Sequence, residues 1–69
     1  MTNKNFTNAV KLYTQAIQLE PLGIYYRDRS KAYLGLKKYD KALEDANKAI
    51  ELDPDGSEHY ITRAMLLMK

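Results

Sequence analysis

Residues 9–21 read AVKLYTQAIQLEP, and residues 42–54 read ALEDANKAIELDP. Both stretches carry the same residue types in the same order: an alanine, an alanine followed by isoleucine, a leucine, an acidic residue and a proline. They stand 33 residues apart, from position 9 to position 42. A repeat of this period is typical of stacked helical units, each of which buries its hydrophobic face against its neighbour. The sequence is therefore expected to form an all-α repeat fold.

Four helices are expected around the two prolines of the repeat. Pro21 and Pro54 disfavour helix at the residue before them, so each is expected to follow a helix end. Apolar residues recur at steps of three or four between these stops. Asn5 is the expected N-cap of the first helix, and Asp55 with Glu58 forms an expected capping box for the fourth. The expected helices cover residues 6–20, 24–36, 40–52 and 58–69.

The composition is that of an ordinary small globular unit. The chain has 69 residues, of which 45% are hydrophobic and 29% charged, and its net charge is +2. A chain of this length buries only about 60% of its unfolded surface, so helix packing, self-association or a parent protein has to supply its stability. The sequence has no cysteine and no apolar stretch long enough to span a membrane. The small net charge gives no argument for nucleic acid.

No set of residues has the pattern of a catalytic, cofactor or metal site. His59 is the single histidine and no cysteine accompanies it, so a surface histidine is expected rather than a metal ligand. The three glycines are isolated and form no phosphate-binding loop. The acidic residues stand among lysines, which favours solvated ion pairs over a desolvated acid–base pair. We therefore expect a protein that is not an enzyme and needs neither cofactor nor metal.

Residues 22–54 carry a second pattern beside the repeat. Its signature positions are occupied by Tyr26, Tyr33, Ala42, Ala49 and Pro54. These positions resemble the tetratricopeptide repeat, a helix-turn-helix unit of about 34 residues with the pattern W-x2-L-G-x2-Y, then A-x3-F, then P. Arg29 and Ser30 depart from the Leu-Gly pair, and Ala46 departs from the aromatic residue. Residues 25–34 are more similar to the repeats of co-chaperones and of a chaperone-bound phosphatase than to the general pattern.

The resemblance implies a short, right-handed solenoid fragment built from antiparallel helix-turn-helix repeats. Within a single unit of residues 1–69, it implies a partial repeat at 1–21, a complete repeat at 22–54 and a partial repeat at 55–69. Each repeat of the family is a helix A followed by a helix B, so this chain would begin on a B helix and end on an A helix. Its end helices are expected to self-associate or to be covered by flanking sequence of a parent protein.

The repeat also predicts the core. Small residues are expected where A and B helices approach closely, namely at Ala42, Ala46 and Ala49. Because Ala46 replaces a larger family residue, a larger neighbour is expected to fill the space beside it, the candidates being Tyr13, Tyr33 and Leu43.

The resemblance implies a function in protein–protein interaction, as a cytoplasmic adaptor or co-chaperone-like scaffold. In the family the A helices line a groove that receives an extended peptide. Carried over to this sequence, the groove residues are Ile24, Arg27, Asp28, Lys31, Leu34, Glu58, Ile61, Thr62 and Met65. A mixed face of charge, isoleucine and methionine suits adaptable contact with a peptide. The simpler interpretation of the same residues is a solvated helix face.

Some relatives hold a terminal carboxylate with lysine, arginine and asparagine side chains on three successive A helices. If residues 24–36 are the middle A helix, Asp28 replaces the asparagine, and Glu58 and Thr62 replace the lysine and the arginine. If they are the first A helix, Arg27 can serve for lysine, but Lys31 and Thr62 stand at asparagine positions. Neither register restores the set, so a basic or mixed client is expected rather than an acidic tail.

Two other functions fit parts of the sequence. The first is a structural module that binds no client peptide and self-assembles through its exposed end helices. The second is an RNA-binding helical repeat, which rests on Arg27, Arg29 and Lys31 alone. Salt-sensitive binding to generic RNA would favour the second. Neither a nucleic-acid partner nor a membrane is expected for the main interpretation.

Overall fold

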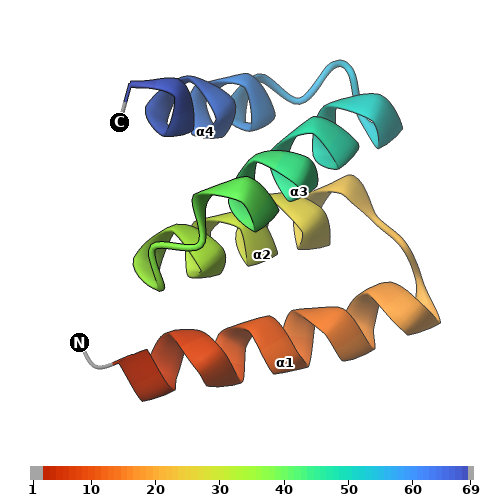
Figure 1. Cartoon of the computed structure of the whole chain (residues 1–69). Coiled ribbons are helices and arrows are strands. Elements are labelled where there is room, and N and C mark those ends of the chain that lie inside the picture. Colours follow the sequence, from red (N-terminus) through yellow and green to blue (C-terminus); the bar gives the residue numbers. More distant parts are fainter. Residues whose placement is uncertain (1–2, 69) are drawn as a thin grey trace.

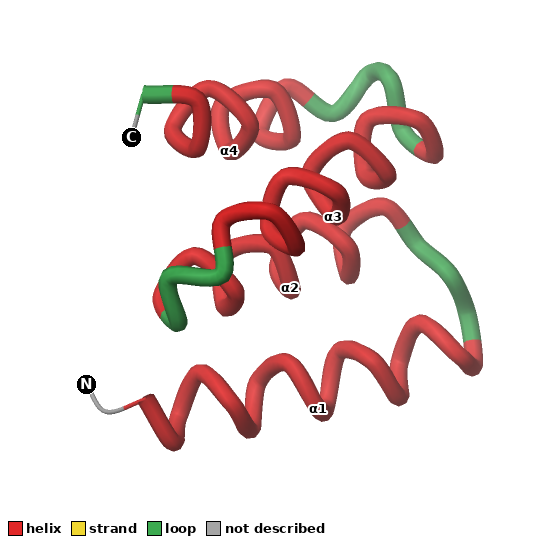
Figure 2. The backbone as a smooth tube through the Cα atoms, in the orientation of Figure 1, coloured by secondary structure: helices red, strands yellow, loops and turns green. Residues whose placement is uncertain are grey.

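Four helices make up the part of the chain that the computed structural model describes, residues 3–68. They are α1 (Asn3–Leu19), α2 (Gly23–Gly35), α3 (Tyr39–Leu52) and α4 (Ser57–Leu67). Each helix runs antiparallel to the one before it, and α2 and α3 lie between α1 and α4 (Figure 1). Short loops join them, and residues 3–68 contain no strand (Figure 2). The expected all-α, antiparallel helical repeat fold is confirmed.

The helix ends agree with the proline stops but not with the expected caps. α1 ends at Leu19 and α3 at Leu52, so Pro21 and Pro54 lie in the following loops. Asn5 was expected as an N-cap, but it lies inside α1, which begins at Asn3. The ring of Phe6 lies over Gly35, where a Cβ atom would stand 2.5 Å from it, and this contact holds the first turn of α1 against α2.

The capping box expected for α4 is also wrong. The residue before α4 is Gly56, and no side chain caps the helix there among the described residues. The nearby Asp53 turns to His59 instead, with its Oδ2 atom 3.2 Å from the histidine Nε2. The carboxylate at this loop therefore fixes a side chain of α4 rather than its backbone N–H groups.

The core is a close contact between α2 and α3 built on small residues. Ala42, Ala46 and Ala49 of α3 are fully buried, as expected. Ser30 of α2 donates a hydrogen bond of 2.6 Å from its Oγ atom to the Ala42 carbonyl oxygen. A serine fits here because a larger side chain would hold the two helices apart. The cluster around Ala42 and Ala46 contains Leu66, and Tyr33, Leu34 and Leu43 pack against it.

Two of the three residues expected to fill the space beside Ala46, Tyr33 and Leu43, therefore do so. The third, Tyr13, is half-buried and lines a hollow between α1 and α2.

Replacing Ala42 with leucine is expected to destabilise the chain by about 1–3 kcal/mol, because three added carbon atoms overpack a contact that has no free volume. The measurement is urea unfolding followed by circular dichroism. Lys41→Leu adds a similar side chain at the adjacent exposed position and is the matched control, with an expected change below about 0.5 kcal/mol. An Ala42→Leu chain as stable as the wild type would contradict the packing described here.

Arg29 joins α2 to both of its neighbours along the chain. Its Nε and Nη2 atoms donate to the two carboxylate oxygens of Asp45 on α3, at 2.7 and 2.8 Å. Its Nη1 atom donates to Thr14 Oγ1 on α1 at 3.1 Å. The guanidinium also lies 5.5 and 5.8 Å from the ring centroids of Tyr26 and Tyr33. The hydrogen bond with Asp45 raises the pKa of Arg29 above its ordinary value.

His59 is buried, not on the surface as expected. Only 2% of it is exposed, its Nε2 atom faces Asp53, and its Nδ1 atom has no hydrogen-bond partner among the described residues. The space for the ring comes from glycines: a Cβ atom on Gly56 would stand 2.5 Å from the ring, and one on Gly23 would stand 3.4 Å from Nε2. The sequence contains these glycines but does not indicate that the His59 ring occupies the space beside them.

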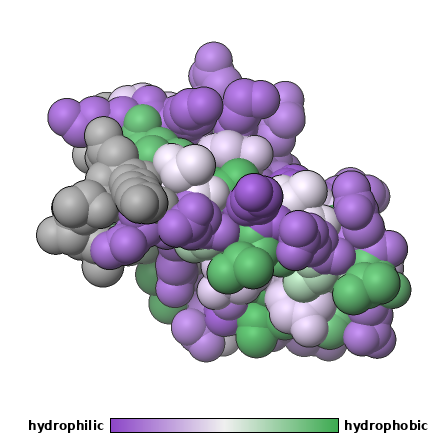
Figure 3. All heavy atoms as spheres, turned by 90° about the horizontal axis from the view of Figure 1, so that it is seen from below, coloured by the Kyte–Doolittle hydropathy of each residue, from purple (hydrophilic) through white to green (hydrophobic). Residues whose placement is uncertain are grey.

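Large apolar side chains also remain on the outside, on α1 and on α4. The view onto α1 shows hydrophobic side chains set among hydrophilic ones rather than a uniformly polar face (Figure 3). Leu12 is 64% exposed on α1, and Leu67 is 68% exposed on α4. Both outer helices thus carry exposed apolar side chains, and the self-association expected for them stays a prediction.

Candidate functional site

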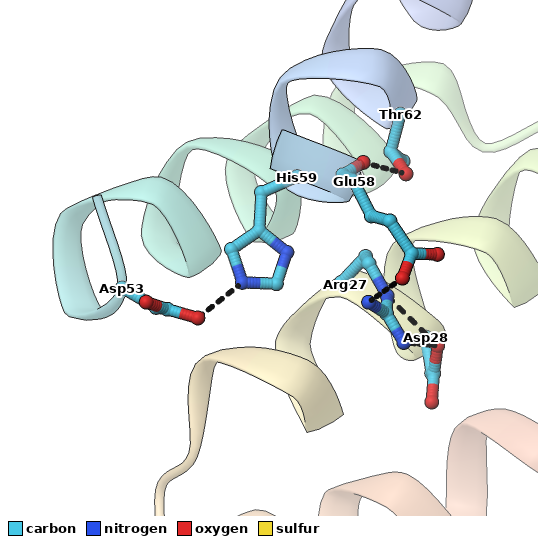
Figure 4. Close-up of polar contacts among 6 residues, drawn as sticks. All are labelled: Arg27, Asp28, Asp53, Glu58, His59 and Thr62. Atoms are coloured by element: carbon cyan, nitrogen blue, oxygen red, sulfur yellow. Dashed lines mark hydrogen bonds and ion pairs between the residues drawn. The ribbon is translucent and has the colours of Figure 1, made fainter. Parts of the chain in front are cut away.

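Four of the nine expected groove residues, Arg27, Asp28, Glu58 and Thr62, lie where α2 and α4 come side by side (Figure 4). Arg27 of α2 points towards the start of α4, and its Nη1 atom is 3.4 Å from Glu58 Oε2. On its other side, the Nη2 atom of Arg27 is 3.2 Å from Asp28 Oδ1. A single guanidinium thus stands between two carboxylates and ties the two helices together.

Exposure separates the nine expected residues into three groups. Ile24, Lys31, Glu58, Ile61 and Met65 are exposed, Arg27, Asp28 and Leu34 are half-buried, and Thr62 is buried. Thr62 is 1% exposed, and its hydroxyl donates to the Glu58 carbonyl oxygen at 2.9 Å. Because its side chain is enclosed, Thr62 offers no atom to a ligand and is left out of the candidate site. Leu34 packs against the core cluster, so at most the edge of its side chain is available to a ligand.

The five exposed members and the half-buried Arg27 and Asp28 make up a mixed set, which we call the α2–α4 face: Ile24, Arg27, Asp28, Lys31, Glu58, Ile61 and Met65. Its isoleucines are 46% exposed at Ile24 and 59% at Ile61. Exposed apolar side chains next to charged ones can hold an extended peptide by side-chain contact, with the charges selecting its sequence. The Arg27 cluster itself carries one positive and two negative charges, so it is an acidic spot on this face.

The basic group considered for RNA does not exist as a surface. Arg29 is turned inward to Asp45 and Thr14, and Arg27 is held between its two carboxylates. Lys31 alone of the three stays exposed. One lysine beside two carboxylates cannot neutralise a run of phosphates, so the RNA interpretation loses its basis.

A hollow of about 300 Å³ between α1 and α2 was missed at the sequence level. It is lined by Asn5, Phe6, Ala9, Tyr13, Asp28, Lys31 and Ala32. Asp28 and Lys31 belong to the expected groove set, but the residues from α1 do not. The only signal for them in the sequence was the internal repeat, which aligns Ala9 and Tyr13 with the buried Ala42 and Ala46.

No three metal-ligating side chains gather within residues 3–68. No helix in this part of the chain is both long enough and apolar enough to cross a bilayer.

Comparison with known proteins shows one family and several relatives. Residues 23–56 match the tetratricopeptide repeat family. The chain is 45% identical over 69 residues to the STIP1 homolog protein of Dictyostelium discoideum, covering 99% of this chain and 12% of the relative. It is 50% identical over 62 residues to serine/threonine-protein phosphatase 5 of Homo sapiens, covering 88% of this chain and 12% of the relative.

A third relative is the small glutamine-rich tetratricopeptide repeat-containing protein 2 of Saccharomyces cerevisiae. It is 46% identical over 61 residues, covering 87% of this chain and 18% of the relative. The chain thus spans less than a fifth of the length of each of these three proteins. No solved structure matches it with significance.

Proposed function

Because the chain belongs to the tetratricopeptide repeat family, we propose that it is a protein-interaction module whose α2–α4 face holds an extended polypeptide segment. The observation that carries this proposal is the row of exposed apolar side chains on that face, Ile24, Ile61 and Met65, beside the acidic spot at Arg27. Such side chains gain free energy when a partner covers them. The role that follows is that of an adaptor or co-chaperone-like scaffold in the cytoplasm.

The charges on the face select the client. The face has two cations, Arg27 and Lys31, and two carboxylates, Asp28 and Glu58, and both carboxylates contact Arg27. An interface disfavours like charges that meet without a counter-ion. A client segment with lysine or arginine next to apolar residues fits this pattern. A client that brings a carboxylate to the same place does not.

The proposal includes no catalytic role. One relative is named as a phosphatase, but this chain spans only 12% of that protein, so its activity is not carried over. We also propose the division into a complete repeat at residues 22–54 between partial repeats at 1–21 and 55–69. The family match over residues 23–56 supports its central part.

Replacing Met65 with aspartate is expected to weaken client binding by about tenfold or more, because a charge in an apolar contact costs more than about 1.4 kcal/mol. The client for this test is the best-binding sequence from an array of extended peptides, titrated against the chain by calorimetry. Leu52→Asp is the matched control, since Leu52 and Met65 are both 41% exposed and only Met65 lies on the α2–α4 face. Equal binding by both variants, or no selected peptide at all, would overturn the proposed function.

A further inference from the structure

The internal repeat relates the two outer helices to the two inner ones. α3 repeats the sequence of α1 with an offset of 33 residues, as Ala9 and Ala42 show. α4 repeats α2 with an offset of 34, from Tyr26 to Tyr60. The contact between α2 and α3 is the most extensive one between any two of the helices. α4 therefore repeats the α2 side of this contact, and α1 repeats the α3 side.

The repeat of the α2 side on α4 is uncovered. On α2, Ser30 is fully buried against α3, and Tyr33 packs on the core. Their equivalents on α4 are Ala64 and Leu67, and both are exposed. The apolar face of α4 thus corresponds to the face of α2 that packs on α3. Among the described residues, no helix covers it.

The repeat of the α3 side on α1 is only partly covered. Ala42 and Ala46 of α3 are fully buried under α2, whereas their equivalents Ala9 and Tyr13 are half-buried. The same two residues line the hollow between α1 and α2, together with Asp28 and others. Within the chain, α2 occupies the corresponding place between α3 and α4. The hollow is thus where one more helix of the α2 type would sit.

We propose that α4 of one copy docks into the α1–α2 hollow of a second copy, so that chains associate head to tail. The occupant fits because α4 has the sequence pattern of α2, the helix that fills the equivalent site within each chain. The side-chain volumes compensate: Tyr13 is larger than the equivalent Ala46, and Leu67 is smaller than the equivalent Tyr33. The contact uses Ile24 and Ile61, which also belong to the α2–α4 face, so a client bound on that face would compete with it.

One pair of residues identifies this contact. Within the chain, Arg27 of α2 meets Glu58 of α4 at 3.4 Å. Between copies, the equivalent positions are Ile61 on the docking helix and Ile24 on the receiving chain, and both are exposed in the single chain. The ion pair inside the chain thus corresponds to a contact of two isoleucines between chains. In the single chain, water surrounds both isoleucines.

A second pair limits the strength of the contact. The equivalent of Arg29 is Arg63, which lies 5.5 Å from the ring of Tyr60 just as Arg29 lies over Tyr26. The equivalent of Asp45 is Leu12, so Arg63 meets no carboxylate at this place. The association is therefore weaker than the internal contact and depends on concentration. Because α1 and α4 are outer layers on opposite sides, each docking leaves new free ends (Figure 1).

The first test is the mass of the chain in solution as a function of concentration, by sedimentation. A single chain has a mass of 8.0 kDa. The expected result is a mean mass that rises steadily through the millimolar range without stopping at a dimer, since a heterologous contact does not close on itself unless the rotation makes a ring. A mass of one chain at every concentration overturns the proposal, and so does a dimer that adds no further copies.

The second test uses complementary variants, Ile61→Arg and Ile24→Glu. Each alone should abolish the rise in mass, because a charge faces an isoleucine. Mixed in equal amounts, they should regain it, because the new Arg–Glu contact copies the internal pair of Arg27 and Glu58. Circular dichroism of each variant establishes that it is folded. Association that persists in both single variants, or a mixture that stays monomeric, overturns the proposed contact.

Leu19→Asp is the control for the loss of any exposed apolar residue. Leu19 is the equivalent of Leu52, which stays exposed although α2 covers α3, so it should lie outside the contact. This variant should associate as the wild type does, and loss of association in it would count against the docking position. Ile24 and Ile61 also lie on the α2–α4 face, so Leu67→Asp, which lies in the docking contact but outside that face, separates the two proposals: it should lose association and still bind the selected peptide as the wild type does.

Discussion

Replacing Arg29 with methionine is expected to remove about 3–5 kcal/mol of stability, which is enough to unfold most of the chain at room temperature. A chain of this length has only about 3–10 kcal/mol of stability in total. Breaking a buried ion pair from one side leaves the other charge without compensation, and this is the origin of the large effect. Here the charge left behind is Asp45, which is 6% exposed and has no other hydrogen-bond partner recorded among the described residues.

Arg63→Met is the control for this prediction, because Arg63 repeats the position of Arg29 on α4. It lies over Tyr60 at the same 5.5 Å, but its polar contact is a single long hydrogen bond of 3.5 Å to Asn47. The expected loss is below about 1 kcal/mol, as for other exposed polar contacts. Urea unfolding of both variants gives the comparison, and an Arg29→Met chain within 1 kcal/mol of the wild type would contradict the described geometry.

The double variant Arg29→Met with Asp45→Leu separates the ion pair from the packing. Replacing both partners by apolar groups of similar volume is often neutral or stabilising, because the desolvation of two charges is removed together with their attraction. The double variant should therefore be more stable than either single variant. If the loss of stability in the double variant equals the sum of the losses in the two single variants, the two residues do not act as a pair.

The parts of this fold that follow a period could be predicted from the sequence. The repeat with its prolines predicts where α1 and α3 end, and the spacing of small residues predicts the core alanines, Ala42, Ala46 and Ala49. These features are periodic because each repeat packs against the next in the same way. Single residues that break the period were not predicted. His59 was expected on the surface, because one histidine has no pattern that reveals its burial.

Arg29 was misjudged for a related reason. Its charge and its neighbours Arg27 and Lys31 fit a basic surface, whereas the family pattern places an apolar residue there. Only the position of Asp45, sixteen residues on, shows that the charge is paired across two helices. The predicted helix caps at Asn5 and Asp55 were wrong because tertiary contacts override the local sequence signal. One such contact is Phe6 on Gly35, which a short sequence window does not contain.

The candidate site shows the same division. The family pattern predicts that the residues of the α2–α4 face lie together, and the ion pair of Arg27 with Glu58 places two of them across the contact of α2 with α4. The exposure of each side chain could not be predicted, because it depends on how close α2 and α4 come. Thr62 illustrates the difference: its position in the pattern is that of a groove residue, and its burial at the contact removes it from the surface.

The chain is expected to give no saturable binding to a free acidic C-terminal peptide at low-micromolar concentration, although it resembles repeats that hold such tails. Two carboxylates, Asp28 and Glu58, stand where donors would be required, and Arg27 is already engaged by both. A terminal carboxylate would have to displace one of them, with the exposed Lys31 as the one further cation of the α2–α4 face to receive it. Like charges brought together at an interface oppose binding.

Changing the charges should create the binding that the wild type lacks. Asp28→Asn with Glu58→Lys removes both carboxylates from Arg27 and leaves three cations on the α2–α4 face, Arg27, Lys31 and the lysine introduced at position 58. An acidic peptide should therefore bind at least about tenfold more tightly, which is about 1.4 kcal/mol. Glu51→Gln with Glu44→Lys makes the same change in net charge at exposed positions of α3 and is the control. Calorimetric titration at two salt concentrations distinguishes the cases, since a gain in the control as well would indicate non-specific attraction. Tight, carboxylate-dependent binding by the wild type would show that Arg27 is free to exchange its partners and that the acidic spot does not select the client.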